Sequence, residues 1–182
     1  MARSRAAGAA WPMMTEPVIT RPARPDDVTA VLGLVRELAE YEHASDQVRA
    51  SVDDLSAALF GPFGSEGAAG GPRVSALVAE SDGRVVGIAV YFVSFSTWTG
   101  RHGIYLEDLY VTPAERRRGV GRALLARLAA EAVANGWSRL EWSVLDWNTP
   151  AIEFYRACGA QALSEWTTFR VCGESLQALA GC

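Results

Sequence analysis

A run of arginines and glycines near the middle of the chain has the composition of an anion-binding turn. Residues 109 to 121 read Leu-Tyr-Val-Thr-Pro-Ala-Glu-Arg-Arg-Arg-Gly-Val-Gly, so an apolar strand pattern passes through a basic turn into a helical one. The first N–H groups of a helix lack backbone partners and lie at the positive end of its dipole, and glycine lets an anion approach the backbone closely. The dipole disfavours cations here, so Arg116, Arg117 and Arg118 imply an anionic ligand. The segment predicts a phosphate site.

Two familiar phosphate motifs do not fit this turn. A Rossmann dinucleotide site needs a third glycine at the position of Leu124. All 17 basic residues are arginine, and without lysine neither a Walker phosphate loop nor a pyridoxal Schiff base can form. The alternative to a phosphate site is a solvated charge cluster at the start of a helix.

Two adjacent carboxylates, Glu107 and Asp108, interrupt the apolar strand that leads into the turn. Alternate residues of a strand face opposite sides, so at least one carboxylate is expected to face a functional partner. A carboxylate can hold a cation or assist the removal of a proton. A salt bridge or a helix cap is the alternative for either residue.

Tyr155 is a third residue with usable chemistry. A phenol with a pKa of about 10 can donate a proton to a strongly basic group. For a single tyrosine between Phe154 and Arg156, however, the residues alone favour packing in a core.

Hydrophobic spacing and turn signals predict the elements that position these residues. Apolar runs with a period of two indicate strands, and spacings of three and four indicate helices. Asp82-Gly83 is a strong hairpin signal, and Ser51 with Asp54 three residues later signals the start of a helix. The predicted strands cover residues 18–21, 74–80, 84–95, 104–111, 139–145 and 165–171, and the predicted helices cover residues 25–39, 51–59, 119–136 and 149–158. This order predicts an α/β fold with a central mixed, mostly antiparallel sheet of six to seven strands and helices on both faces.

The length of 182 residues suits one sizeable core. Residues 1–17 contain arginines and small residues but no proper export signal, so we expect a disordered extension before a single domain at 18–182. The Gly/Pro/Ser-rich stretch 61–72 is expected to be a loop. The longest strongly apolar run, Val85 to Val93, is far shorter than the roughly 20 residues of a membrane helix.

Composition narrows the classes of partner. A net charge of −4 disfavours nucleic acid as the main partner and mildly favours a cationic ligand. The three cysteines form no CxxC pair, and His43 and His102 lack ligand spacing, so we expect neither a disulfide framework nor a metal. A reducing cytoplasm is the expected location.

The turn is similar to a motif of a known family. Arg116 to Gly121 resembles the R/Q-x-x-G-x-G/A pyrophosphate loop of the GNAT acetyltransferases, in which backbone amides hold coenzyme A. Three further segments, residues 37–42, 105–109 and 147–155, resemble the diamine (spermidine/spermine) acetyltransferase branch in order and spacing. The resemblance covers nearly everything from Val18 onward, and the chain departs from it mainly in the Gly-rich stretch, the N-terminal extension and the lysine-free surface.

The resemblance implies a homodimeric GNAT enzyme that moves an acetyl group from acetyl-CoA directly to a primary amine of a polyamine-like or diamine-like acceptor. It implies catalytic roles for Glu107, which would assist deprotonation through water, and for Tyr155, which would protonate the thiolate. The implied acceptor contacts are Tyr41, Glu42, Glu107 and Asp108. The implied cofactor contacts are Leu109, Tyr110, Val111, Arg116, Arg117, Arg118, Gly119, Val120, Gly121, Arg122, Asn148 and Ala151.

Some alternatives stay open at this point. The acceptor could be another amine, such as a thialysine-like amino acid, an aminoglycoside or a protein N-terminus. A coenzyme A-binding module that has lost catalysis would carry much of the same pattern. Asn148 has a simpler interpretation too, because it precedes a predicted helix and would serve as its N-cap.

Overall fold

The computed structural model describes residues 18–61 and 74–181. The predicted extension at 1–17 and nearly all of the predicted loop at 61–72 therefore lie outside the described residues. The chain divides into two compact units, Met1–Leu145 and Asp146–Cys182. The single domain therefore stays a prediction. No helix in the described part of the chain is long and apolar enough to span a membrane.

The described residues of the first unit form a mixed five-stranded sheet whose strands lie in chain order. The first four strands pair antiparallel, and the last pairs parallel with its neighbour, as predicted for a mostly antiparallel sheet. Asp82 and Gly83 both have positive φ (48° and 72°), as a two-residue type I′ hairpin requires. The strands are β1 (Ile19–Pro22), β2 (Ser75–Ser81), β3 (Arg84–Ser96), β4 (Arg101–Val111) and β5 (Leu140–Glu141).

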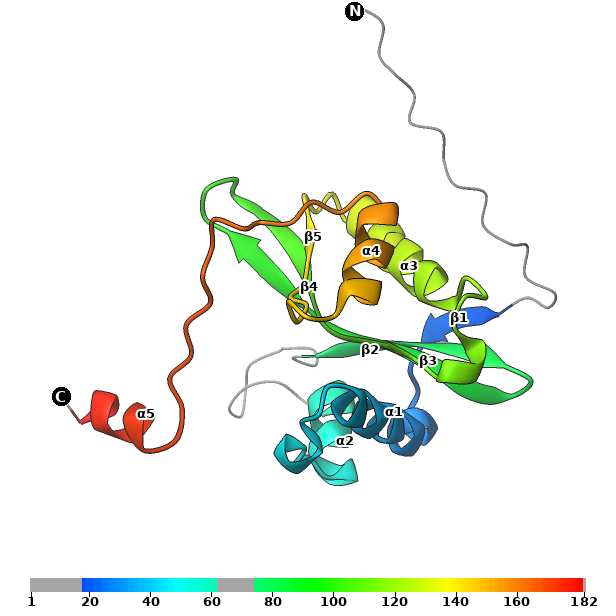
Figure 1. Cartoon of the computed structure of the whole chain (residues 1–182), viewed down its shortest axis with the longest axis horizontal. Coiled ribbons are helices and arrows are strands. Elements are labelled where there is room, and N and C mark those ends of the chain that lie inside the picture. The colour runs from blue at the N-terminus through cyan, green and yellow to red at the C-terminus, as the bar shows by residue number, and fades with distance from the viewer. Residues whose placement is uncertain (1–17, 62–73, 182) are drawn as a thin grey trace, which may run out of the picture. The chain divides into compact units, whose positions relative to one another are not determined.

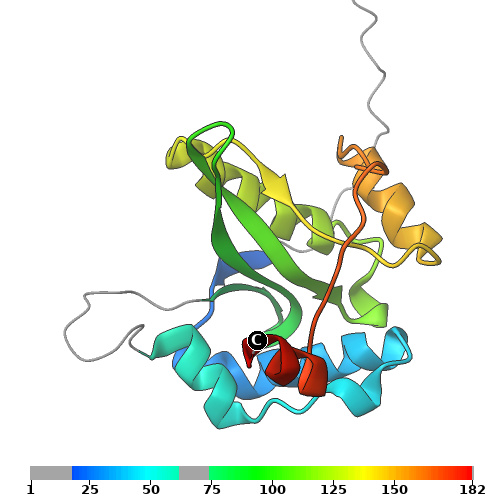
Figure 2. The same cartoon turned by 90° about the vertical axis from the view of Figure 1, so that its left-hand side faces the viewer.

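Helices cover both faces of this sheet (Figures 1 and 2). On one face, α1 (Val28–Tyr41) packs against β3 and β4, and α2 (Val52–Phe60) packs against α1. On the other face, α3 (Val120–Ala134) contacts the strands. The core on the α1 side consists of Val31, Leu34, Leu59, Ala76, Val78, Ile88, Val90 and Tyr110. The predicted three-layer α/β fold is confirmed.

The predicted helices begin where the sequence signals place them, whereas the helix at Gly173–Ala180 was not predicted. A short 3-10 turn at Pro25–Asp27 leads into α1. Ser51 and Asp54 form a capping box at α2, in which the Asp54 N–H donates to Ser51 Oγ (3.1 Å) and the Ser51 N–H donates to Asp54 Oδ2 (2.9 Å). Such reciprocal bonds satisfy two N–H groups that the helix itself cannot pair.

Two strand predictions were wrong in extent or existence. The strand expected at 139–145 is only β5, and residues 165–171 form no strand, so the described part of the chain has five strands instead of six to seven. In the second unit, α4 (Thr149–Ala157) is followed by a segment without regular structure and then by α5 (Gly173–Ala180). β-Branched and aromatic residues give strand propensity, but a strand also needs a neighbour to pair its N–H and C=O groups.

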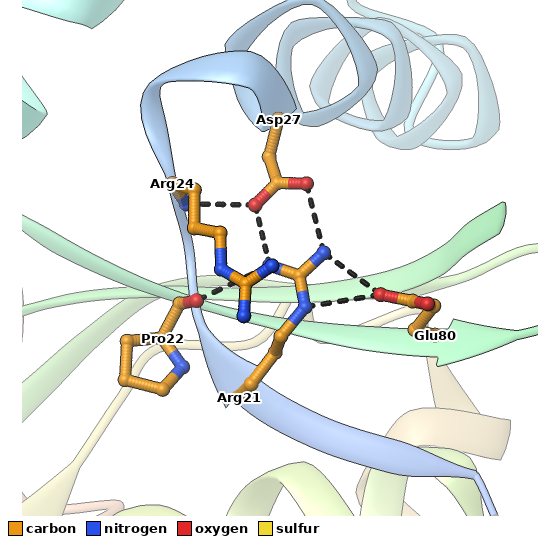
Figure 3. A network of polar contacts seen from close by, with 5 residues as sticks. All are labelled: Arg21, Pro22, Arg24, Asp27 and Glu80. Atoms are coloured by element: carbon orange, nitrogen blue, oxygen red, sulfur yellow. Dashed lines mark hydrogen bonds and ion pairs between the residues drawn. The ribbon is translucent and has the colours of Figure 1, made fainter. Parts of the chain in front are cut away.

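A charged network ties the first strand to the first helix (Figure 3). The Arg21 guanidinium donates to both carboxylate oxygens of Asp27 (2.6 and 3.0 Å) and, through Nε and Nη2, to Glu80 Oε2 (3.0 and 2.8 Å). The Arg24 N–H also donates to Asp27 (2.7 Å). The side chains of Arg21 and Asp27 are only 17% and 10% exposed, so the network joins β1, β2 and the start of α1 in a partly desolvated place.

Arg21→Ala is expected to lower the free energy of unfolding at pH 7 by about 2 kcal/mol, because it leaves two carboxylates partly buried without their cation. The Arg21 hydrogen bond lowers the pKa of Asp27, so this stabilisation is present at neutral pH and is lost as the pH falls through the folded-state pKa. Urea unfolding at pH 7 and below pH 4 measures both effects. The exposed Arg84 provides the control, and an equal loss in Arg84→Ala would contradict the prediction.

Candidate functional site

The turn between β4 and α3 has an unusual backbone. Arg117 and Gly119 both have positive φ (61° and 84°), a conformation that is uncommon for a residue with a side chain. Turns that alternate between right-handed and left-handed residues direct successive N–H groups into one concavity that can hold an anion. Gly119 is the N-cap of α3 and the helix start has no side-chain cap, so no side chain satisfies its first N–H groups. These features are compatible with an anion site, and the phosphate site stays a prediction.

The start of α3 is fixed closely against the sheet. A Cβ on Gly87 of β3 would lie 3.3 Å from Val120 Cγ1 and 3.1 Å from the Tyr110 carbonyl oxygen, so glycine allows the helix to approach there. Further along α3, the two carboxylate oxygens of Glu131 lie 3.0 and 2.9 Å from the Tyr91 hydroxyl of β3. These contacts fix α3 against the sheet at both ends, and the turn before α3 is thereby held at the end of β4.

The half of β4 that leads into the turn is paired on one side only. β5 pairs with Ile104 and Tyr105, and beyond them the β5 side of β4 has no strand partner among the described residues of this unit. The Thr112 N–H donates to the Val86 carbonyl on the β3 side (3.0 Å), so alternation directs the N–H and C=O groups of Leu109 and Val111 to the open side. An extended ligand could bond to this edge as an added strand does.

The two carboxylates lie at a β-bulge in β4. Val90 pairs with Asp108 whereas Tyr91 pairs with Leu106, so Glu107 is the extra residue. Glu107 is exposed and Asp108 is partly buried. Two consecutive charges in an apolar strand were the sequence signal for this bulge, although the pattern was interpreted as simple alternation.

Asp108 lies among other acidic groups. Burial, and then the nearby charges of Glu107 and Glu42, raise the pKa of Asp108 to about 6. Burial also raises the pKa of Glu42, which directly follows α1. The end of α1 and the bulge in β4 thus bring together three of the four predicted acceptor residues. A cationic group placed here would relieve the repulsion among the carboxylates.

Asp108→Asn is expected to raise the free energy of unfolding at pH 7 by about 1 to 2 kcal/mol, because it removes a charge whose burial is unfavourable. A raised carboxyl pKa means that this penalty is absent below pH 3.8, the ordinary value, and grows as the pH rises to about 6. Urea unfolding at pH 4 and pH 7 should show the gain only at pH 7. An equal gain in Asp46→Asn, which changes an exposed aspartate, would show that burial of the charge is not the cause.

Arg116 joins the end of α1 to the end of β4. Its guanidinium carbon lies 5.0 Å from the ring centroid of Tyr41 and 5.3 Å from that of Tyr110, and its Nε donates to the Val111 carbonyl oxygen (3.0 Å). Burial and the charge of Glu37 raise the pKa of Tyr110. The side chain of Tyr110 packs in the core on the α1 side. Tyr41 and Tyr110 were predicted as acceptor and cofactor contacts, but their shared contact with Arg116 and the nearby charge of Glu37 were not predicted from the sequence.

The three arginines of the turn have different surroundings. Arg118 forms an ion pair with Glu115 (Nη1 to Oε2, 2.5 Å), whereas Arg117 is exposed and has positive φ. Arg116 lies over two aromatic rings. Spacing alone could not distinguish the three, because it does not reveal which partners the tertiary structure provides.

The remaining predicted residues lie in the second unit. Asn148 is 6% exposed and its Oδ1 accepts a hydrogen bond from the Ala151 N–H (3.3 Å), so it caps α4, as its alternative interpretation predicted. Tyr155 lies on α4, with its ring 5.3 Å from that of Phe154. The roles of Asn148 and Ala151 in cofactor binding and of Tyr155 in catalysis stay predictions.

No group of three His, Cys, Asp or Glu side chains within residues 18–61 and 74–181 could hold a metal ion. His102, on β4, packs edge-on against Phe95 of β3, with ring centroids 5.0 Å apart. His43, just beyond the end of α1, has positive φ (58°).

Comparisons with known proteins bear on this geometry. Residues 36–160 match the model of the acetyltransferase (GNAT) family. Thialysine N-epsilon-acetyltransferase of Bos taurus is 43% identical over 175 residues, which cover 90% of this chain and 98% of that protein. Spermidine/spermine N(1)-acetyltransferase-like protein 1 of Homo sapiens is 32% identical over 166 residues, which cover 86% of this chain and 23% of that protein. An integron cassette protein from the mobile metagenome of V. cholerae superposes with a TM-score of 0.72 at 27% identity, covering 91% of this chain and 98% of that one.

Proposed function

Because this chain belongs to the GNAT family of acetyltransferases, we propose that it transfers the acetyl group of acetyl-CoA to a primary amine of a small cationic acceptor. The observation that carries the proposal is the order of features along β4. The carboxylate bulge, the open backbone edge and the turn with positive φ follow one another between Glu107 and Gly119. An amine site and a phosphate site would thereby lie at the two ends of one exposed edge.

Acetyl-CoA supplies an acetyl group activated as a thioester. The backbone N–H groups of residues 117–122 would hold its pyrophosphate, and the open-side groups of Leu109 and the N–H of Val111, whose carbonyl accepts from Arg116, would bind its pantetheine arm and orient the acetyl carbonyl. The positive φ of Arg117 and Gly119 and the unpaired edge of β4 support these assignments. Fixed backbone donors stabilise developing negative charge without reorganising during the reaction.

The carboxylates would hold and deprotonate the acceptor. Asp108 and Glu42 would bind its ammonium beside Tyr41, and Glu107, exposed at the bulge, would accept a proton from the amine through water. Burial and the nearby charges of Glu107 and Glu42 raise the pKa of Asp108, which supports this assignment, because an ammonium would stabilise the buried carboxylate and relieve the repulsion. Binding should weaken below about pH 6, where Asp108 becomes protonated.

Direct transfer balances without an enzyme nucleophile. The amine nitrogen forms the new bond to the acetyl carbon, and the bond between that carbon and sulfur breaks. Before the attack, one proton of the ammonium passes through water to Glu107 and on to solvent. The Tyr155 phenol gives a proton to the departing sulfur, and the second proton that leaves the nitrogen as the amide forms replaces it through solvent. The place of Tyr155 on a half-buried face of α4 is compatible with this role.

Two classes of acceptor are favoured. Polyamines and diamines follow from the segments that resemble the diamine branch and from the acidic cluster, which suits a ligand with several positive charges. The bovine relative is named for thialysine, a lysine analogue that carries the same kind of terminal ammonium at the end of its side chain, opposite its α-amino and α-carboxylate groups. We propose a short aliphatic amine as the common feature of the two.

Thiol release across a panel of amines tests this function. Spermidine, 1,3-diaminopropane, thialysine, ornithine and kanamycin would each be mixed with acetyl-CoA, and the acetylated product identified by mass spectrometry. At least one short aliphatic amine should release thiol and gain one acetyl group in equal amounts. Coenzyme A binding by calorimetry without thiol release for any amine would show a non-catalytic binding module instead.

We also propose that the enzyme is a cytoplasmic homodimer that acts on small molecules. In the part of the second unit that follows α4, six large apolar side chains are at least 48% exposed, a quantity of apolar surface that favours burial against another chain. They are Leu163, Trp166, Phe169, Val171, Leu176 and Leu179. Analytical ultracentrifugation should give twice the 19.5 kDa of one chain, and a mass of one chain at micromolar concentration would reject the dimer.

A further inference from the structure

Arg116 belongs by sequence to the cofactor turn, but its side chain faces the acceptor end of the site. The guanidinium lies against Tyr41, the last residue of α1, and against Tyr110 of β4, at 5.0 and 5.3 Å from the ring centroids. Its Nε donates to the Val111 carbonyl oxygen (3.0 Å). One side chain thus contacts the end of a helix, the core of the sheet and the end of the open edge.

These contacts need arginine in particular. A planar guanidinium can stack on aromatic rings while its Nε keeps a hydrogen bond in the same plane, whereas a lysine ammonium cannot do both. Glu37 of α1 adds a negative charge close to the Tyr110 ring, which favours a cation beside that ring. The contacts therefore use the shape of the guanidinium as well as its charge.

We propose that Arg116 is a positioning residue that couples the cofactor turn to the acceptor side by holding Tyr41 against β4. The inference rests on the proposed function. When the backbone of the turn binds the pyrophosphate, Arg116 is held in place, and the end of α1, with Tyr41 and Glu42, is held with it. Linkage then requires the reverse, so that a change in Tyr41 alters the affinity for the cofactor.

A competing hypothesis makes the Arg116 side chain a simple phosphate ligand, as its place in the motif implies. Under that hypothesis, Tyr41 has no influence on the cofactor. The two hypotheses differ in a quantity that needs no acceptor, namely the dissociation constant of coenzyme A itself.

A double-mutant cycle on coenzyme A binding separates them. Calorimetry would be performed on the full chain, on Tyr41→Leu, on Arg116→Gln and on the double variant. Coupling predicts that Tyr41→Leu lowers the affinity of the parent for coenzyme A about fivefold, which corresponds to the loss of about one exposed cation–π contact. The same substitution should have no further effect on the affinity when Arg116 is already glutamine. Tyr41→Phe, which keeps a ring, should bind within about twofold of the parent.

Arg117→Gln is the matched control, because it removes the same charge from an exposed neighbour in the same turn. It should lower the affinity for coenzyme A because a positive charge is lost, and Tyr41→Leu should still have its fivefold effect in this background. Amide exchange gives a second readout: coenzyme A should slow exchange at residues 41–44 in the parent and not in Arg116→Gln.

The outcomes are distinct. If Tyr41→Leu binds coenzyme A like the parent, or if the two substitutions add independently, the coupling is wrong while the proposed function stands. If the parent binds no coenzyme A at all, the proposed function fails and this inference fails with it.

Discussion

Tyr155→Phe is expected to lower turnover by about 100-fold, with little change in the affinity for coenzyme A. The proposed role of Tyr155 is to give a proton to the departing sulfur, and a positioned general acid typically contributes a factor of about 10² to 10⁴. Phenylalanine keeps the ring that packs beside Phe154 and removes only the hydroxyl. Steady-state thiol release gives turnover, and calorimetry gives the dissociation constant of coenzyme A.

Tyr105→Phe is the matched control for that substitution. The Tyr105 hydroxyl lies 3.0 Å from Ser143 Oγ, and its ring stacks on Phe92. Loss of this exposed hydroxyl should change turnover by less than about twofold. If Tyr155→Phe turned over as fast as the parent, Tyr155 would have no place in the mechanism, and the thiolate would have to leave with electrostatic stabilisation alone.

Gly119→Val is expected to weaken coenzyme A binding by about 100-fold. Gly119 has a φ of 84°, which a β-branched residue adopts only at a considerable cost, so the turn should change its conformation. Loss of two charge-assisted backbone bonds, each worth about 1.5 kcal/mol, corresponds to about two orders of magnitude in affinity.

Gly136→Val tests whether strain alone explains the effect. Gly136 follows α3 at its opposite end and also has positive φ (68°), so its substitution introduces similar strain away from the proposed phosphate site. It should lower the unfolding free energy by about 1 kcal/mol and leave coenzyme A binding unchanged. Equal losses of affinity in the two variants would remove the turn from cofactor binding.

Elements whose signals are local were predicted best from the sequence. Asp82-Gly83 specifies a two-residue hairpin through the φ values that the turn needs, and Ser51 with Asp54 specifies a helix start through two hydrogen bonds. Both were confirmed because nothing distant in the chain is needed to satisfy them. The turn before α3 is a candidate anion site for the same reason, since its glycines and its helix start are neighbours in the chain.

Features that depend on distant partners were predicted less well. The strands expected at 139–145 and 165–171 had suitable residues, but pairing is decided by the neighbouring strand, and β5 is two residues long. The bulge at Glu107 depends on the register between β3 and β4. Similarly, three consecutive arginines were indistinguishable until the tertiary structure placed Glu115 beside Arg118 and two rings beside Arg116.

The proposed acceptor site would be a case in which function opposes stability. Burial of Asp108, together with the charges of Glu107 and Glu42, raises its pKa to about 6. An isolated fold would be more stable without them, and Asp108→Asn should show it. Their proximity becomes favourable once a cationic amine occupies the site, which is the reason to assign them to the acceptor.

Amide hydrogen exchange with saturating coenzyme A tests the central claim most directly. If the turn and the open edge of β4 hold the cofactor, exchange should slow at residues 117–122 and at Leu109 and Val111, while the exposed hairpin at residues 97–100 should exchange as before. Protection confined to other parts of the chain, with coenzyme A demonstrably bound, would show that the cofactor lies elsewhere and would contradict the proposed site.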